Sequence, residues 1–143
     1  MEDRQRGIYC IQFHPEVSHT VHGSAVLHNC LFKACGAAGD WTMANEVTIW
    51  SKAAGRIACR FHARDVHLVM GPLRQESPVR FRVSIDGQRP GPAQGLDVDD
   101  SGSGTVVEQR LYQLIRQPGP IVDRTLEIEF LDAGVEAFAF TFG

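Results

Sequence analysis

The chain has 143 residues, a hydrophobic fraction of 43%, a charged fraction of 22% and a formal net charge of −3 at pH 7. These values are those of one ordinary globular domain, or of a small domain with an attached segment. The slightly acidic balance argues against nucleic acid as a partner, and no apolar run approaches the ~20 residues that span a bilayer.

The first predicted elements are a strand and a helix. Residues 7–13 are rich in β-branched and aromatic side chains, as in a strand, and Pro15 ends it. Residues 22–35 then show helical spacing of the apolar side chains Val26, Leu27, Cys30, Leu31 and Ala34. We therefore expect residues 1–45 to form a short strand–helix segment of α/β type.

Thiol and metal chemistry is weakly indicated. None of the four cysteines forms a C-x-x-C pair, so we expect reduced and mostly buried thiols. Several possible metal ligands lie close together in the sequence, namely His14, Glu16, His19, His22 and His28. Their spacing is not H-E-x-x-H, so we expect adventitious metal binding rather than a built site, and no cofactor.

The string from Gln12 to Gly23, which contains His14-Pro15-Glu16, is specific. It resembles the C-terminal end of the class I glutamine amidotransferase domain of GMP synthase. The resemblance implies that His14 is a general base for a cysteine nucleophile and that Glu16 orients it. The 143 residues contain no G-x-C-x-G setting for that nucleophile. We therefore interpret His14 and Glu16 as a remnant of a Cys-His-Glu triad and expect no glutaminase activity.

From residue 46 onward the apolar side chains recur with a period of two. Alternation of this kind predicts half-buried antiparallel strands, here at residues 56–62, 65–70, 79–86, 110–116, 125–130 and 137–142. Turn-forming residues separate them, among them Asp86-Gly87 and Asp132-Ala133-Gly134. The sequence therefore predicts a mainly β fold in which residues 46–143 form an antiparallel, jelly-roll-like β-sandwich.

Residues 97–108 fit the pattern of a calcium loop, with four candidate oxygen donors at Asp97, Asp99, Ser101 and Glu108. The preceding residues, 89–95, are rich in proline and glycine and cannot form the entering helix of an EF-hand. We expect a polar turn between strands, with a weak calcium site as the alternative.

Two kinds of binding surface are open from the sequence. Exposed aromatic rings stack on sugars, and Trp50 and Tyr112 are the candidates, although a core position suits each as well. The second is a charged surface, with Arg80 and Arg82 on one strand face and Arg110 and Arg116 flanking Tyr112. Such a surface would pair with acidic groups of a partner domain.

Residues 60–71, 79–87, 110–116 and 129–143 carry a second resemblance. They are similar to the C-terminal, carbohydrate-binding-module-like β-sandwich that follows the thioredoxin-like domain in DipZ-type cytochrome c biogenesis proteins. The resemblance implies a thioredoxin-like domain or a carbohydrate as partner, and redox cysteines that belong to that other domain. That family is extracytoplasmic, whereas the polar first six residues of this chain are not a signal peptide, so we expect the chain as written to be cytoplasmic.

The leading hypothesis is a non-catalytic binding or interaction module fused to an amidotransferase remnant. One alternative is an incomplete GMP synthase amidotransferase of purine biosynthesis. Another is a misjoined or mispredicted gene, because the change of pattern near Asn45 falls beside a domain border of each resembled family. Peptide mapping across Asn45 separates a continuous protein from a misjoined one.

Overall fold

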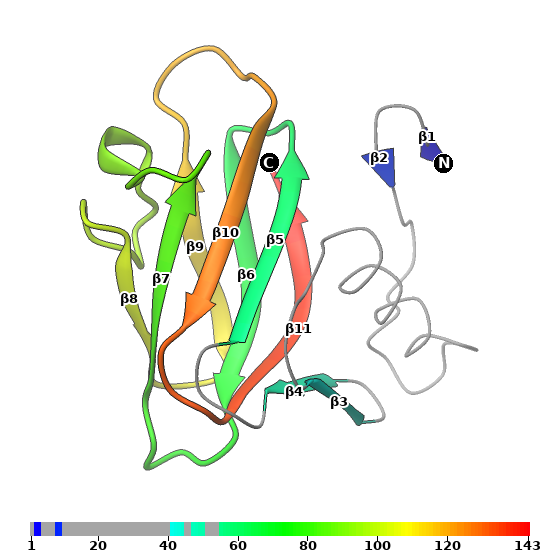
Figure 1. Cartoon of the computed structure of the whole chain (residues 1–143), viewed down its shortest axis with the longest axis vertical. Helices are drawn as coiled ribbons and strands as arrows, with labels where there is room; N and C mark the ends of the chain where they lie inside the picture. The colour runs from blue at the N-terminus through cyan, green and yellow to red at the C-terminus, as the bar shows by residue number, and fades with distance from the viewer. Residues whose placement is uncertain (1, 4–7, 10–40, 45–46, 51–54) are drawn as a thin grey trace.

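The chain folds around two antiparallel β-sheets in a computed structural model (Figure 1). The structure describes the backbone at residues 2–3, 8–9, 41–44 and 47–50, and both backbone and side chains at residues 55–143. Within these ranges no helix is long and apolar enough to cross a membrane. The predicted β-sandwich is thus confirmed, whereas the predicted helix at residues 22–35 lies outside the described residues.

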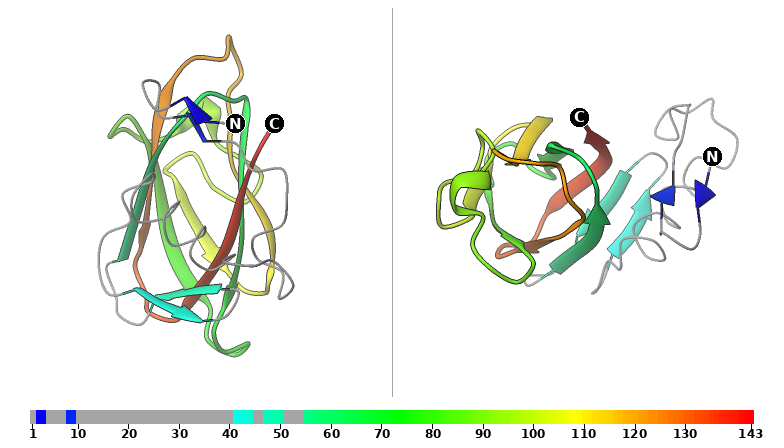
Figure 2. Two further views of the ribbon diagram at one scale, coloured as in Figure 1. Left: turned by 90° about the vertical axis from the view of Figure 1, so that its right-hand side faces the viewer. Right: turned by 90° about the horizontal axis from the view of Figure 1, so that it is seen from above.

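The first sheet has four strands in the order β5 (Gly55–Phe61), β10 (Arg124–Phe130), β7 (Val79–Ile85) and β8 (Ser103–Val106). The second has five, in the order β3 (Trp41–Ala44), β4 (Val47–Trp50), β11 (Val135–Phe142), β6 (Asp65–Pro72) and β9 (Arg110–Arg116). Strands β1 (Glu2–Asp3) and β2 (Ile8–Tyr9) pair separately. Viewed from above, the two larger sheets surround a common interior (Figure 2).

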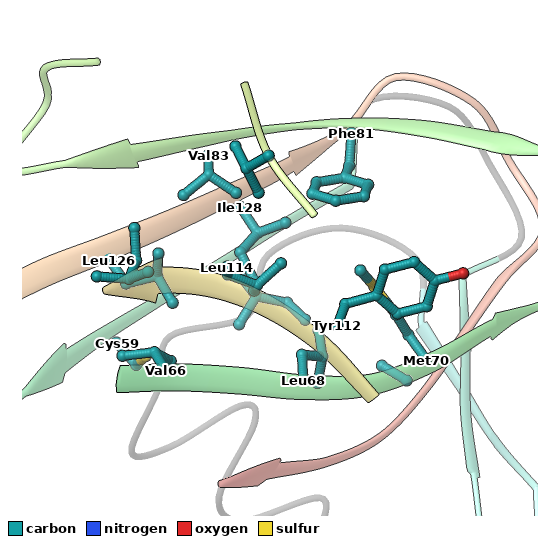
Figure 3. Packing of buried hydrophobic residues seen from close by; sticks show 14 of the residues in the cluster. Cys59, Val66, Leu68, Met70, Phe81, Val83, Tyr112, Leu114, Leu126 and Ile128 are labelled. Carbon is teal, nitrogen blue, oxygen red and sulfur yellow. The ribbon is translucent and has the colours of Figure 1, made fainter. Parts of the chain in front are cut away.

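Strict alternation of side chains places the core between these sheets. Along β5, for example, Ile57, Cys59 and Phe61 are buried while Arg56 and Arg60 are exposed. The same alternation along β10 and β7 of this sheet completes one apolar layer, because successive side chains of a strand point to opposite faces. Figure 3 shows this layer packed against residues of β6 and β9.

The connection between β7 and the following segment is the turn that the sequence predicts at Asp86-Gly87. Both residues have positive φ, at 50° and 74°, and Ile85 and Gln88 exchange backbone hydrogen bonds around them. Two central residues with positive φ match the right-handed twist of the flanking chain. The tight turn that the sequence predicts at Asp86-Gly87 is therefore confirmed.

Two details differ from the sequence prediction. Residues 103–106 form strand β8, although Ser101-Gly102-Ser103-Gly104 reads as a turn. Gly104 pairs with Phe81, and a Cβ at position 104 would overlap the Phe81 ring, so glycine serves close packing here. The pairing of β11 with β6 shifts between Ala137 and Ala139, so the strict alternation predicted for residues 137–142 is interrupted at Phe138.

Candidate functional site

Five polar side chains meet along the outer edge of the five-stranded sheet, where β9 is the last strand. We call them the β9 network: Asp65, His67, Asp97, Arg110 and Gln113. The pairing of β6 with β9 puts His67 opposite Gln113, with both on the outer face. Residues 94–97 then run beside β9, because Gly95 N–H donates to the Leu114 carbonyl at 2.9 Å and Asp97 N–H to the Gln113 carbonyl at 3.2 Å.

Asp97 joins the segment 94–97 to β9 through its side chain as well. One carboxylate oxygen accepts a hydrogen bond from Arg110 Nη2 at 2.6 Å, and the other accepts one from the Gln113 backbone N–H at 2.7 Å. Burial raises the pKa of Asp97, but the hydrogen bonds from Arg110 and Gln113 outweigh it, so its pKa lies below the usual value. Asp97 is therefore an ionised carboxylate that holds the segment 94–97 against β9.

Gln113 is the centre of the network. Its side-chain Nε2 donates to Asp65 Oδ1 at 3.3 Å and lies 3.3 Å from His67 Nε2, while its Oε1 accepts from Leu96 N–H at 3.3 Å. The Asp65 side chain is only 7% exposed and also accepts from Arg64 Nε at 2.8 Å. Buried polar groups require hydrogen-bond partners, and Asp65 and Gln113 both have them. The side chains of the network are therefore held in one arrangement.

Tyr112 belongs to the core, which settles one of the alternatives that the sequence leaves open. It is fully buried, its ring meets that of Phe81 edge-on at a centroid distance of 6.5 Å, and Figure 3 shows it next to Met70. The Arg110 guanidinium lies 3.9 Å from the ring centroid. A ring covered in this way offers no face to a sugar. The side chain of Trp50, the other aromatic candidate, lies outside the described residues.

The hydroxyl of Tyr112 organises the chain just before β9. It donates to the Glu108 carbonyl at 2.8 Å and accepts from the backbone N–H groups of Val107 at 3.1 Å and Glu108 at 3.3 Å. Three backbone groups of one turn are thereby satisfied by one side chain. Tyr112 thus fixes the position from which Arg110 reaches Asp97.

The four arginines predicted as one charged surface lie on two different sheets. Arg80 and Arg82 share the exposed face of β7, whereas Arg110 and Arg116 lie on β9. Arg80 is held by Asp132, which accepts hydrogen bonds from its Nε and Nη2, both at 2.8 Å. These hydrogen bonds, with one from the Arg80 backbone N–H at 3.0 Å and the positive charge of Arg80, lower the pKa of Asp132 to about 2. The prediction that all four arginines form one charged surface is therefore wrong.

The predicted calcium donors do not converge. Asp97 is occupied by Arg110, and one oxygen of Asp99 accepts from Ser101 N–H, the Ser101 hydroxyl and Ser103 N–H at 2.6–3.0 Å. Glu108 lies 3.5 Å from Arg110 instead. Among the described residues no group of three or more His, Cys, Asp and Glu side chains is placed to hold a metal ion. The arrangement is that of the polar turn, with Asp99 as its acceptor.

The triad remnant His14 and Glu16 and the other possible metal ligands, His19, His22 and His28, lie outside the described residues. Three residues of the β9 network were missed by the sequence analysis. Asp65, His67 and Gln113 were read only as parts of strands. The available signal was the polar pair Asp65 and His67 at alternate positions of an otherwise apolar strand. Cys59 is a free thiol buried in the core of residues 55–143.

Comparison with known families finds two matches on this chain. The model described as "Thioredoxin like C-terminal domain" matches residues 29–143, which include β3, upstream of the predicted start at residue 46. The model described as "Glutamine amidotransferase class-I" matches residues 1–34. The resemblance of the first part of the chain to a class I glutamine amidotransferase is thereby confirmed, as is that of the remainder to the C-terminal domain of thioredoxin-like proteins.

Curated relatives match only a short part of the chain. GMP synthase (glutamine-hydrolyzing) of Streptococcus thermophilus is 60% identical over 47 residues, which are 33% of this chain and 9% of that protein. The enzyme of the same name from Alkaliphilus metalliredigens is 47% identical over 47 residues, which again are 33% of this chain and 9% of that protein. The chain thus spans about a tenth of the length of these relatives.

Solved structures match the sandwich. A family two carbohydrate esterase from Cellvibrio japonicus aligns with a TM-score of 0.57 and 10% identity, over 74% of this chain and 29% of the other. One from Clostridium thermocellum, in complex with cellohexaose, aligns with a TM-score of 0.51 and 10% identity, over 68% of this chain and 27% of the other. At this identity the likeness shows the fold alone.

Proposed function

Because this chain belongs to the family of thioredoxin like C-terminal domains, we propose that its β-sandwich is a non-catalytic binding module whose partner is a thioredoxin-like domain. The observation that carries the proposal is the family match over residues 29–143. The finer context that we propose is that of DipZ-type cytochrome c biogenesis and thiol–disulfide proteins, in which the partner domain holds the redox cysteines.

The chemistry of the described surface supports protein binding. Within residues 55–143 the one cysteine, Cys59, is buried, so a thiol for exchange is not presented. The β9 network combines donors and acceptors at the sheet edge, but its carboxylates are ion-paired with arginines. Such a surface recognises complementary polar and apolar groups rather than activating a substrate.

The proposal is tested by titrating the full 143-residue chain with the thioredoxin-like domain of a DipZ-type protein in a calorimeter. Domains that dock on one another form modest, partly polar interfaces, so we expect a dissociation constant on the order of micromolar. A soluble neutral glucan is the competing ligand, and we expect weak or absent binding. Saturable glucan binding that Trp50→Ala removes, with no response to the domain, would reverse the assignment.

We also propose that the amidotransferase-like segment has no glutaminase activity in this chain. His14 and Glu16 supply a base and its orienter, but the 143 residues hold no G-x-C-x-G elbow for a nucleophile. The measurement is ammonia release from glutamine with and without ATP. Release that disappears in His14→Ala would contradict the proposal.

A further inference from the structure

Leu96 is the most exposed large apolar side chain within residues 55–143, at 87% of its full accessible surface. Leu111 of β9 is 46% exposed and pairs with Val69 of β6. The Leu96 N–H donates to Gln113 Oε1, and Gln113 is two residues from Leu111 on the same face. We call Leu96, Leu111 and Val69, with the adjoining His67 and Gln113, the Leu96 surface.

The segment that carries Leu96 is held from both sides. Its neighbours Gly95 and Asp97 each donate a backbone hydrogen bond to β9, and the Asp97 carboxylate binds Gln113 N–H and Arg110. Gly95 permits this approach, because a Cβ there would overlap the Gln113 carbonyl oxygen. An apolar side chain presented by a fixed backbone costs little further ordering when it enters a pocket.

The charges around Leu96 favour a protein over other partners. Nucleic acid and anionic lipid require cations that are free to meet phosphates. Here Arg110 is paired with Asp97 at 2.6 Å, and Arg64 with Asp65 at 2.8 Å. Sugar recognition uses an exposed ring, whereas Tyr112 is buried beneath Arg110. An apolar centre with a satisfied polar rim is the composition of a protein interface.

From this geometry we propose that the Leu96 surface is where the module binds its thioredoxin-like partner domain, with Leu96 inserted into an apolar pocket of that domain. The inference rests on the proposed function for the identity of the partner. His67, whose Nε2 lies 3.3 Å from Gln113 Nε2, would then lie at the rim of the pocket. By this proposal Leu96 contacts the partner, and the residues of the β9 network hold the segment that carries Leu96 in position.

The test compares variants of the full chain in the same calorimetric titration with the DipZ-type thioredoxin-like domain. We expect Leu96→Asp to weaken binding at least about tenfold, since a carboxylate would have to be buried in the pocket. Leu111→Asp provides a second variant at the same surface. The matched control is Leu73→Asp, because Leu73 is 48% exposed but lies in the turn after β6, and we expect its affinity to stay within about twofold.

The outcomes separate this inference from the proposed function. Binding by the wild type that Leu96→Asp and Leu111→Asp leave unchanged, with melting temperatures retained, refutes the Leu96 surface and leaves the partner assignment standing. Equal weakening by Leu73→Asp also refutes it, because the effect would then not be specific to this surface. Absence of binding by the wild type overturns the proposed function and this inference together.

Discussion

The outer face of the four-stranded sheet and the β9 edge of the five-stranded sheet both carry arginine–aspartate pairs, but the two pairs differ in what they hold. Arg80 and Asp132 meet in solvent, with side chains 66% and 32% exposed. Arg110 and Asp97 are less exposed, at 39% and 19%. Both aspartates also accept a backbone N–H, but Asp132 binds that of Arg80 itself, whereas Asp97 binds that of a third residue, Gln113. The arginine–aspartate pair on the four-stranded sheet is therefore largely solvated. The pair at the β9 edge is part of a connected, partly buried hydrogen-bond network.

The sharpest way to break this comparison is to remove one aspartate from each side. We expect Asp97→Ala to destabilise the chain by about 2 kcal/mol, because Gln113 N–H and Arg110 both lose their acceptor at a partly buried site. Asp132→Ala removes a more exposed pair and an exposed acceptor for the Arg80 N–H, which water can replace, so it should shift the unfolding midpoint less. Urea unfolding of the two variants measures the difference. Equal losses would mean that the β9 edge is as solvated as the other face.

The hydroxyl of Tyr112 gives the second expected effect. Tyr112→Phe keeps the packing with Phe81 but leaves the N–H groups of Val107 and Glu108 without their acceptor. We expect a loss of about 1–2 kcal/mol in the free energy of unfolding. Phe142→Leu, at a 53% exposed position, is the control and should change little. A neutral Tyr112→Phe would show that solvent satisfies this turn equally well.

Acid should weaken both pairs over one pH window. The pKa values of Asp97 and Asp132 are lowered in the folded chain, that of Asp132 to about 2. A lowered folded pKa contributes stability that is present above the unfolded value of about 4 and is lost as the pH falls toward the folded value. We therefore expect the melting temperature to decline between about pH 4 and pH 2. Asp97→Asn and Asp132→Asn should each flatten that decline, whereas Asp100→Asn serves as the control.

Calcium should have the smallest effect. Asp99 already accepts hydrogen bonds from Ser101 and Ser103, and Asp97 is paired with Arg110. Added calcium at low millimolar concentration is therefore expected to leave the melting temperature unchanged. A calorimetric scan with calcium and with a chelator measures this. A clear upward shift that Asp99→Ala abolishes would restore the metal interpretation of the loop.

The sequence predicts the strands well where alternation is uninterrupted. Residues 110–116 form β9 as predicted, and β7 differs from its prediction by one residue. Strand β8 was missed because Gly104, which makes room for the Phe81 ring, reads as turn chemistry. Gly104 and Phe81 are far apart in the sequence, so the neighbouring residues of Gly104 do not reveal that it packs against a ring.

The candidate site was harder to predict than the fold. Asp65, Asp97 and Gln113 meet only because β6 pairs with β9 and because residues 94–97 return to the sheet edge. The sequence analysis did single out Asp97, but only within an expected polar turn with calcium binding as the alternative, since a string of acidic and small residues fits more than one structure. The register between distant strands decides which polar side chains share a face, and a single sequence does not contain it.

The close approach permitted by Gly95 bears on how this protein behaves at high concentration. An outermost strand with unpaired backbone groups is a template on which strands of other molecules can assemble into fibrils. On β9 the carbonyls of Leu114 and Gln113 are already taken by Gly95 and Asp97 of the same chain. A larger residue at position 95 would push this segment away and uncover the strand. One glycine in a proline-rich connection thus keeps the molecule from growing its sheet into a neighbour.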